Sequence, residues 1–213
     1  MTLNVADLRA LSRLSLLPVL LLLSCAPMLS MQPPIPMRPE ASNEYGLAGG
    51  VSQAVSGDCV GCLPLAGLTN TGLVGQFWFR HRMDERYRVG VLVSAGNAYA
   101  FSAGFQGQMD LFEGEDLRIS ADVGCGLLWC SAGIPFAFQA NPGLWLYGGG
   151  YGAITLSSDV KPMLRIPVGF AVNVNDRLQL LGEVSGVWRP TTPNQLGNQM
   201  WFLVAGVGAV ARL

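Results

Sequence analysis

Apolar and polar residues alternate strictly along several stretches of this chain. Every second residue from Leu164 to Val174 is a large apolar one, and stretches 87–93, 99–110 and 117–124 show the same repeat. A period of two places successive side chains on opposite faces of a sheet. The sequence therefore predicts β-strands with one apolar face and one face that is polar or made of glycine.

The composition indicates that the apolar face contacts lipid. Charged residues make up 13% of the chain, against about 25% in soluble domains. Glycine accounts for 27 of the 213 residues, and Lys161 is the only lysine. A sheet in lipid must pair every backbone N–H and C=O group without water, so it has to close on itself. We therefore predict an all-β fold, a closed antiparallel up-and-down membrane β-barrel.

Turn residues divide the second part of the chain into about ten strands of the length that crosses a bilayer. Asn175-Asp176 is a strong hairpin signal, because both residues tolerate positive φ. The stretches 45–55 and 131–139 have the weakest pattern, so a barrel of about eight strands is the alternative. The predicted strands are 45–55, 69–82, 86–95, 98–110, 116–126, 131–139, 143–155, 162–174, 177–189 and 199–212.

A soluble β-sandwich or lipocalin-like barrel would show the same alternation with its apolar face turned inward. Its solvent face would then carry Gly90, Gly104, Gly124, Gly126 and Gly169, where glycine weakens a strand. Small residues are instead expected where a narrow barrel must accommodate its own interior side chains. The glycine positions therefore favour the membrane barrel.

The N-terminal residues have the organisation of an export signal. Arg9 and Arg13 precede an apolar run, 14–23, that is too short for a permanent transmembrane helix. The run ends in Leu22-Leu23-Ser24-Cys25, which resembles a bacterial lipobox. The resemblance implies a lipoprotein in which Cys25 carries diacylglycerol and a further fatty acid such as palmitate. An ordinary secretory signal with a chance cysteine is the alternative.

The residues after Cys25 are rich in proline, which favours an extended polyproline II chain over packed structure. We expect this segment to be a spacer between the lipid and the barrel. The predicted organisation is a lipoprotein signal peptide at 1–24, a lipidated proline-rich tether at 25–44 and a transmembrane β-barrel at 45–213.

Residues 45–213 resemble small bacterial outer-membrane β-barrels in their pattern of strands and turns. Residues 208–213 partly match the C-terminal signal that the barrel-assembly machinery reads, although Leu213 stands where that signal has an aromatic residue. The resemblance implies the bacterial outer membrane as the location. It also implies outer-membrane lipid and the barrel-assembly machinery as partners.

Polar residues on the predicted inner face are the candidate functional residues. In a barrel of about ten strands or fewer they largely fill the lumen, and buried charges have to pair. Asp122 and Glu183 are therefore each expected to contact an arginine. A plug of ion pairs, a narrow path for small anionic solutes and a ligand cavity open at one end all remain possible. The predicted lumen network is Arg80, Arg86, Arg88, Gln106, Asp110, Arg118, Asp122, Arg165 and Glu183.

Four cysteines accompany Cys25, namely Cys59, Cys62, Cys125 and Cys130. Exported proteins meet an oxidising compartment, so we expect two disulfides at the outer rim. The local pairs Cys59–Cys62 and Cys125–Cys130 are preferred among three possible connectivities. Redox chemistry at the Cys-x-x-Cys motif, a zinc site built from all four sulfurs and free thiols are the alternatives.

No motif supports an enzyme, and we predict no catalytic residue, metal or cofactor. His81 is the only histidine, and the strand phase places it towards lipid. A net charge of −1 argues against a nucleic-acid partner. We predict a lipid-anchored outer-membrane barrel that acts with other envelope proteins as a structural subunit of a secretion, surface-motility or adhesion assembly. A small channel or binding barrel for anionic solutes is one alternative, and a periplasmic lipid-tethered soluble β domain is the other.

Overall fold

The structure is a computed structural model that describes residues 31–36, 41–56, 71–96, 99–126, 129–155, 161–190 and 199–213. Its strands are β1 (Asn43–Ser56), β2 (Thr71–Arg82), β3 (Tyr87–Gly96), β4 (Tyr99–Glu113), β5 (Leu117–Gly126), β6 (Trp129–Asn141), β7 (Leu144–Thr155), β8 (Lys161–Asn173), β9 (Leu178–Pro190) and β10 (Gln199–Arg212). The described residues include no helix with the length and apolar character needed to cross a membrane.

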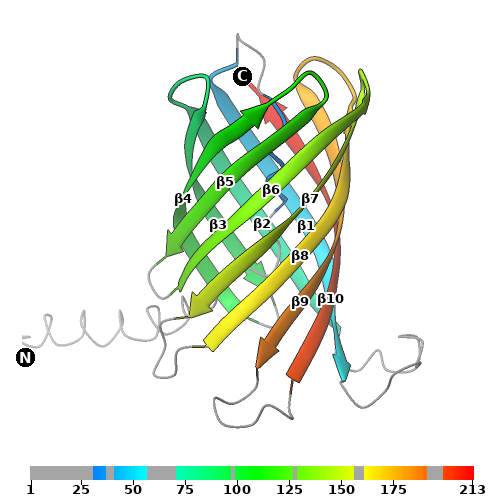
Figure 1. Ribbon diagram of the computed structural model, residues 1–213. Helices are drawn as coiled ribbons and strands as arrows, with labels where there is room; N and C mark the ends of the chain where they lie inside the picture. The colour runs from blue at the N-terminus through cyan, green and yellow to red at the C-terminus, as the bar shows by residue number, and fades with distance from the viewer. Residues whose placement is uncertain are drawn as a thin grey trace, which may run out of the picture.

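The strands form one closed barrel in which each pairs antiparallel with its sequence neighbours and β1 pairs with β10 (Figure 1). The predicted up-and-down barrel of ten strands is therefore confirmed. The eight-strand alternative is wrong, because β1 and β6 both pair with a neighbour on each side. The largest difference in strand bounds is at the end of β4, where a register shift between Asp110 and Phe112 lets pairing continue beyond the predicted end at residue 110.

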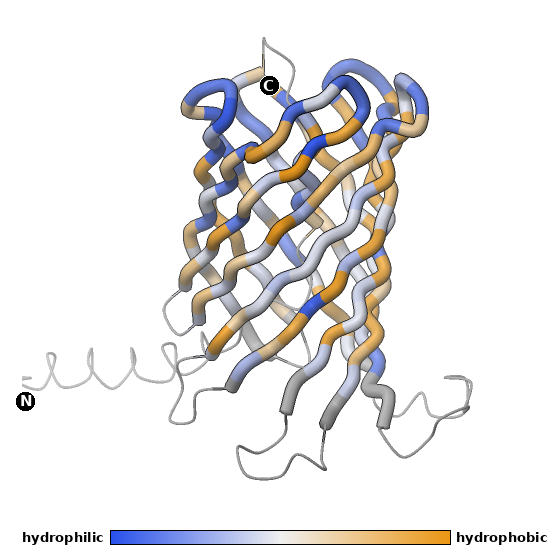
Figure 2. Tube along the Cα trace, viewed as in Figure 1, coloured by the Kyte–Doolittle hydropathy of each residue, from blue (hydrophilic) through white to orange (hydrophobic). Residues whose placement is uncertain are grey.

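Tight turns gather at one end of the barrel, which we call the turn rim. It holds residues 83–86, 114–116, 142–143 and 174–177, and these turns are polar (Figure 2). Oδ1 of Asp84 accepts hydrogen bonds from the backbone N–H groups of Arg86 and Tyr87, at 2.8 and 2.7 Å. Oδ1 of Asn175 accepts equivalent bonds at the hairpin predicted from the sequence. These side-chain bonds stabilise the turns. We call the other end, where β3, β5 and β7 finish, the opposite rim.

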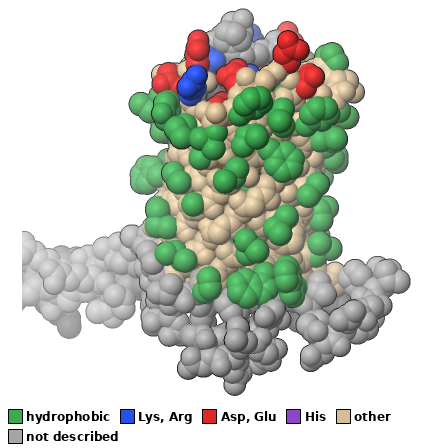
Figure 3. All heavy atoms as spheres, viewed as in Figure 1, with side chains coloured by type: hydrophobic (Ala, Val, Ile, Leu, Met, Phe, Trp, Pro, Cys, Tyr) green, Lys and Arg blue, Asp and Glu red, His purple; other side chains and the backbone are tan. Residues whose placement is uncertain are grey.

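The outer wall of the barrel is apolar. On β8, the side chains of Ile166 and Val168 are 51% and 65% exposed. The side chain of Arg165, which directly precedes Ile166, is 3% exposed. Figure 3 shows apolar side chains spread over the wall, with the charged groups of the visible face gathered at the turn rim. In a soluble barrel, the apolar side chains would point into the interior and the polar side chains would point outwards. The strands therefore turn their apolar side outwards, as a barrel surrounded by lipid requires.

Glycines lie opposite aromatic rings at several places in the sheet. Gly46 of β1 pairs directly with Trp78 of β2, and Gly133 of β6 pairs with Tyr151 of β7. A Cβ atom at either glycine would overlap with the partner's ring. Each ring therefore lies across the neighbouring strand in space that only glycine leaves free. Further pairs of this kind are Gly169–Tyr147, Gly148–Phe136 and Gly182–Phe170.

Candidate functional site in the barrel lumen

The lumen holds the buried charged side chains of the described strands and is the candidate functional site. The strand phase turns eight of the nine predicted network residues inwards, from β2, β3, β4, β5, β8 and β9. These residues are Arg80, Arg88, Gln106, Asp110, Arg118, Asp122, Arg165 and Glu183.

Arg86 is the exception, because it lies in a turn and is exposed to solvent. Strand β3 begins at Tyr87, and the Asp84 carboxylate already binds the backbone N–H of Arg86 within the turn. The prediction that Arg86 belongs to the lumen is therefore wrong. His81, also near the turn rim, is exposed, and its Nδ1 lies 2.9 Å from Oδ1 of Asn43.

Glu44 is the centre of one buried cluster near the turn rim. Its side chain is fully buried. Nε of Arg80 donates to Oε1 of Glu44 at 2.9 Å, and Nη2 of Arg80 donates to the same atom. Nε of Arg212 donates to Oε2 of Glu44 at 3.3 Å, and its Nη2 donates to Oε1 of Gln179 at 2.9 Å. A single carboxylate thus compensates two buried guanidinium groups.

Asp110 is the centre of a second cluster beside the first. Nη2 of Arg88 donates to its Oδ2 at 2.5 Å, and the Ser120 hydroxyl donates to its Oδ1 at 2.6 Å. Nη1 of Arg118 lies 3.8 Å from Oδ2. Arg118 also forms an ion pair with Glu113, whose side chain is half exposed. Asp110 is therefore satisfied by partners from two other strands.

Gln108 joins the two clusters into one network. Its Oε1 accepts hydrogen bonds from Nη1 of Arg80 at 3.1 Å and from Nη1 of Arg88 at 2.8 Å. The members come from the turn-rim half of β1, β2, β3, β4, β5, β9 and β10. We call this set the turn-rim network: Glu44, Arg80, Arg88, Gln108, Asp110, Arg118, Ser120, Gln179 and Arg212.

Sequence reasoning missed Glu44 and Arg212 as site residues. The predicted first strand began at residue 45, which left Glu44 in the tether. The alternation continues back through Ala48 and Gly46 to Glu44, and that continuation is the signal that identifies Glu44 as inward-facing. The sequence indicates Arg212 only as part of the C-terminal signal at residues 208–213.

Residues 31–36 lie inside the lumen, although sequence analysis assigned them to a spacer. Met31 and Ile35 are 0% and 2% exposed. The N–H of Met31 donates to Oε1 of Gln76 at 3.4 Å, and Nη1 of Arg88 donates to the C=O of Ile35 at 3.5 Å. Proline has no N–H group, so a proline-rich chain can be buried with few backbone donors left to satisfy.

Among the described residues, the carboxylates nearer the opposite rim form no ion pair with an arginine. Both oxygens of Asp122 accept from Nε2 of Gln106, at 2.9 and 2.8 Å. Oε1 of Glu183 accepts from the Ser185 hydroxyl at 2.7 Å. The prediction that each contacts an arginine is wrong: within the described part of the chain, the lumen ion pairs involve Glu44, Asp110 and Glu113.

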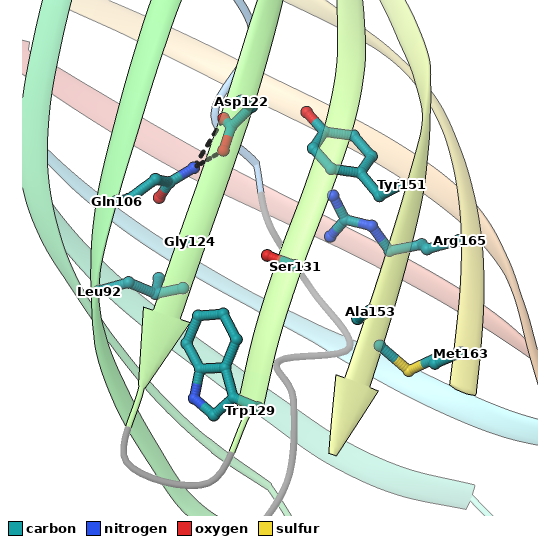
Figure 4. A pocket seen from close by; sticks show the side chains of 10 residues that line it. All are labelled: Leu92, Gln106, Asp122, Gly124, Trp129, Ser131, Tyr151, Ala153, Met163 and Arg165. Carbon is teal, nitrogen blue, oxygen red and sulfur yellow. Dashed lines mark hydrogen bonds between the residues drawn. The ribbon is translucent and has the colours of Figure 1, made fainter. Parts of the chain in front are cut away.

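A small cavity opens beside Asp122 (Figure 4). Its volume is about 30 Å³. The side chains of Gln106, Asp122 and Arg165 line it on the polar side, and Leu92, Trp129 and Met163 line it on the apolar side. The guanidinium carbon of Arg165 lies 4.5 Å from the centroid of the Tyr151 ring.

The structure joins Cys125 and Cys130 in a disulfide between β5 and β6, with their Cα atoms 4.1 Å apart. Cys25, Cys59 and Cys62 lie outside the described residues, so their predicted roles stay predictions. Across the described ranges, no group of three or more His, Cys, Asp or Glu side chains could hold a metal ion.

No protein-family model matches the sequence, and no curated protein matches it. Among solved structures, an outer-membrane channel from Pseudomonas putida F1 is 10% identical, with a TM-score of 0.54 over 86% of this chain and 100% of that one. Neisserial surface protein A is 9% identical, with a TM-score of 0.42 over 80% of this chain and 97% of that one. A de novo designed transmembrane β-barrel is 12% identical, with a TM-score of 0.40 over 84% of this chain and 100% of that one. The likeness to the Pseudomonas channel shows the fold alone, which is that of an outer-membrane β-barrel.

Proposed function

We propose that the protein is a lipid-anchored barrel of the bacterial outer membrane with a closed lumen, and that it acts as a structural subunit of a cell-envelope assembly. The observation that carries this proposal is the filling of the lumen. The turn-rim network occupies the inner wall, and residues 31–36 lie in the space that the wall encloses. A structural subunit needs a rigid barrel, and paired buried charges between many strands provide one.

Passage of solutes is disfavoured by the same contacts. An ion that crosses the turn-rim half must displace residues 31–36, which lie inside the barrel, and must pass the buried ion pairs Glu44–Arg80 and Asp110–Arg88. Disturbing one of these pairs would leave a buried charge alone, which costs about 3–5 kcal/mol. The lumen therefore opposes transport as long as residues 31–36 and the network stay in place.

A small channel for polar or anionic solutes is the second candidate, and one observation favours it. Among the described contacts, residues 31–36 are held by two long hydrogen bonds, at 3.4 and 3.5 Å, and by no strand pairing. Such a segment can leave the lumen at a lower cost than a strand of the wall.

Planar-bilayer recording distinguishes the two candidates. The purified, folded full chain should insert into the bilayer and give no stepwise conductance in symmetrical salt. Reproducible conductance steps from the unmodified protein would make the channel the better assignment. A known porin inserted under the same conditions is the positive control.

We also propose that Cys25 carries the lipid and that the barrel-assembly machinery inserts the barrel. An extended chain spans about 3.5 Å per residue, so the six Cα–Cα steps from Cys25 to Met31 can reach roughly 20 Å from the buried Met31. This reach allows a lipid outside the barrel to coexist with a buried segment 31–36. Replacement of Cys25 by Ala should abolish labelling with a fatty-acid analogue, and undiminished labelling would remove the anchor from the proposal.

We propose no enzymatic activity.

The barrel should face the periplasm with its turn rim. Ser42 and Leu213 both lie at this rim, joined by a backbone hydrogen bond of 3.1 Å. Other envelope proteins are then its proposed partners.

A further inference from the structure

Arg165 is a buried cation that forms no direct ion pair among the described residues. Its side chain is 3% exposed, its Nη1 has no hydrogen-bond partner, and it forms no ion pair with a described carboxylate. The face of the Tyr151 ring stabilises the guanidinium at 4.5 Å. A cation–π contact offsets only part of the cost of burying a charge. The site around Arg165 is therefore suited to an anionic group.

Asp122 is a buried carboxylate on the same cavity and is suited to a cationic group. It is 3% exposed, and among the described side chains its carboxylate accepts hydrogen bonds from the neutral amide of Gln106 and from no charged group. The Oε1 atom of Gln106 has no hydrogen-bond partner in the part of the chain that the structure describes. A carboxylate and a free amide oxygen together favour a cationic donor such as an ammonium group.

Asp122 and Arg165 face one cavity as opposite charges, and no direct ion pair joins them among the described contacts (Figure 4). A simple anion there would be repelled by Asp122, and a simple cation would be repelled by Arg165. Water can hydrogen-bond to both groups but brings neither of them an opposite charge. One molecule that carries both charges a few bonds apart satisfies both side chains at once.

The remaining walls limit the size of such a molecule. Leu92, Trp129 and Met163 are at most 8% exposed and form an apolar side of the cavity. The cavity volume of about 30 Å³ corresponds to roughly two or three water molecules. Met side chains adapt easily to a guest, so a compact molecule with a methyl-sized apolar part fits best.

We propose that this cavity is a binding site for a small zwitterion, an α-amino acid no larger than alanine. Its carboxylate accepts from the guanidinium of Arg165. Its ammonium group donates to the carboxylate of Asp122 and to Oε1 of Gln106. Its side chain faces Leu92 and Met163.

Calorimetric titration of the folded full chain in detergent tests this assignment, with glycine and L-alanine as the probes. Acetate and methylammonium each carry one of the two charges, and L-phenylalanine exceeds the cavity. The variants are Arg165→Met, Asp122→Asn and, as the matched control, Arg86→Met in an exposed turn. Heat-modifiable gel mobility shows whether each variant is folded before it is titrated.

The proposal expects glycine or alanine to bind and the other three probes to bind at least about tenfold more weakly, a difference of about 1.4 kcal/mol. Arg165→Met and Asp122→Asn should each weaken alanine binding about tenfold or more, while Arg86→Met leaves it unchanged. Binding of acetate equal to that of alanine, unaffected by Asp122→Asn, would overturn it in favour of an anion site. Absence of heat with both amino acids on the folded protein would overturn it in favour of a cavity that holds water only.

Discussion

At the scale of single residues, the position of a charge decides how much its pairing contributes. Glu44 is completely buried between Arg80 and Arg212, whereas the Glu113 side chain is 50% exposed beside Arg118. Water screens the second pair and cannot reach the first. Exposed pairs contribute about 0–1 kcal/mol, but breaking a buried pair costs about 3–5 kcal/mol.

Replacement of Glu44 by Ala should therefore destabilise the barrel by about 3–5 kcal/mol, because two buried guanidinium groups lose their carboxylate. The matched replacement Glu113→Ala should change stability by about 1 kcal/mol or less. The temperature at which the folded gel band disappears measures both effects. Equal temperatures for the two variants would show that the Glu44 cluster is solvated.

At the scale of strands, alternation determines which side of a strand faces outwards. It does not determine which charged side chains form ion pairs. The bounds of the strands and their apolar side could be predicted, because both follow from a local period of two. Ion pairing could not be predicted, because it depends on register around the closed sheet. Glu44 and Arg212 bond across a separation of 168 residues, while Asp122 finds Gln106 on the next strand instead of an arginine.

Strand pairing also explains why some glycines cannot be replaced. A Cβ atom at Gly46 would overlap with the buried Trp78 ring, but nothing lies within 4 Å of a Cβ atom at Gly150. Gly46→Ala should destabilise the barrel by about 1–3 kcal/mol, as overpacking usually does. Gly150→Ala is the control and should be neutral or stabilising. Denaturant titration in detergent compares them, and equal midpoints would contradict the Gly46–Trp78 contact.

At the scale of the whole molecule, the barrel encloses a piece of its own chain. The sequence of residues 31–36 does not predict burial in the lumen, because a proline-rich segment is equally compatible with a solvated spacer. Burial of Met31 and Ile35 depends on the size of the lumen and on the side chains that leave space at its centre. Both are properties of the closed barrel and not of any one strand.

Deletion of residues 31–36 should turn the closed barrel into a leaky one, because the space they occupy becomes available to water. Small conductance steps are expected in planar bilayers from the deletion variant and none from the parent. A control variant that keeps the length but changes Met31 to Leu should stay closed, since it preserves an apolar side chain of similar volume. Absence of conductance steps from the folded deletion variant would show that the turn-rim network closes the lumen without residues 31–36.

The apolar side chains of β8 point away from the lumen, and labelling along this strand in a bilayer measures their orientation. A carbene reagent that partitions into the bilayer can be photoactivated with the protein in lipid vesicles, and mass spectrometry then locates the modified residues. Modification is expected at Leu164, Ile166, Val168 and Phe170, together with protection of Arg165, Pro167 and Ala171. Modification of the odd-numbered positions instead, or of none of these residues, would contradict a barrel that presents this face to lipid.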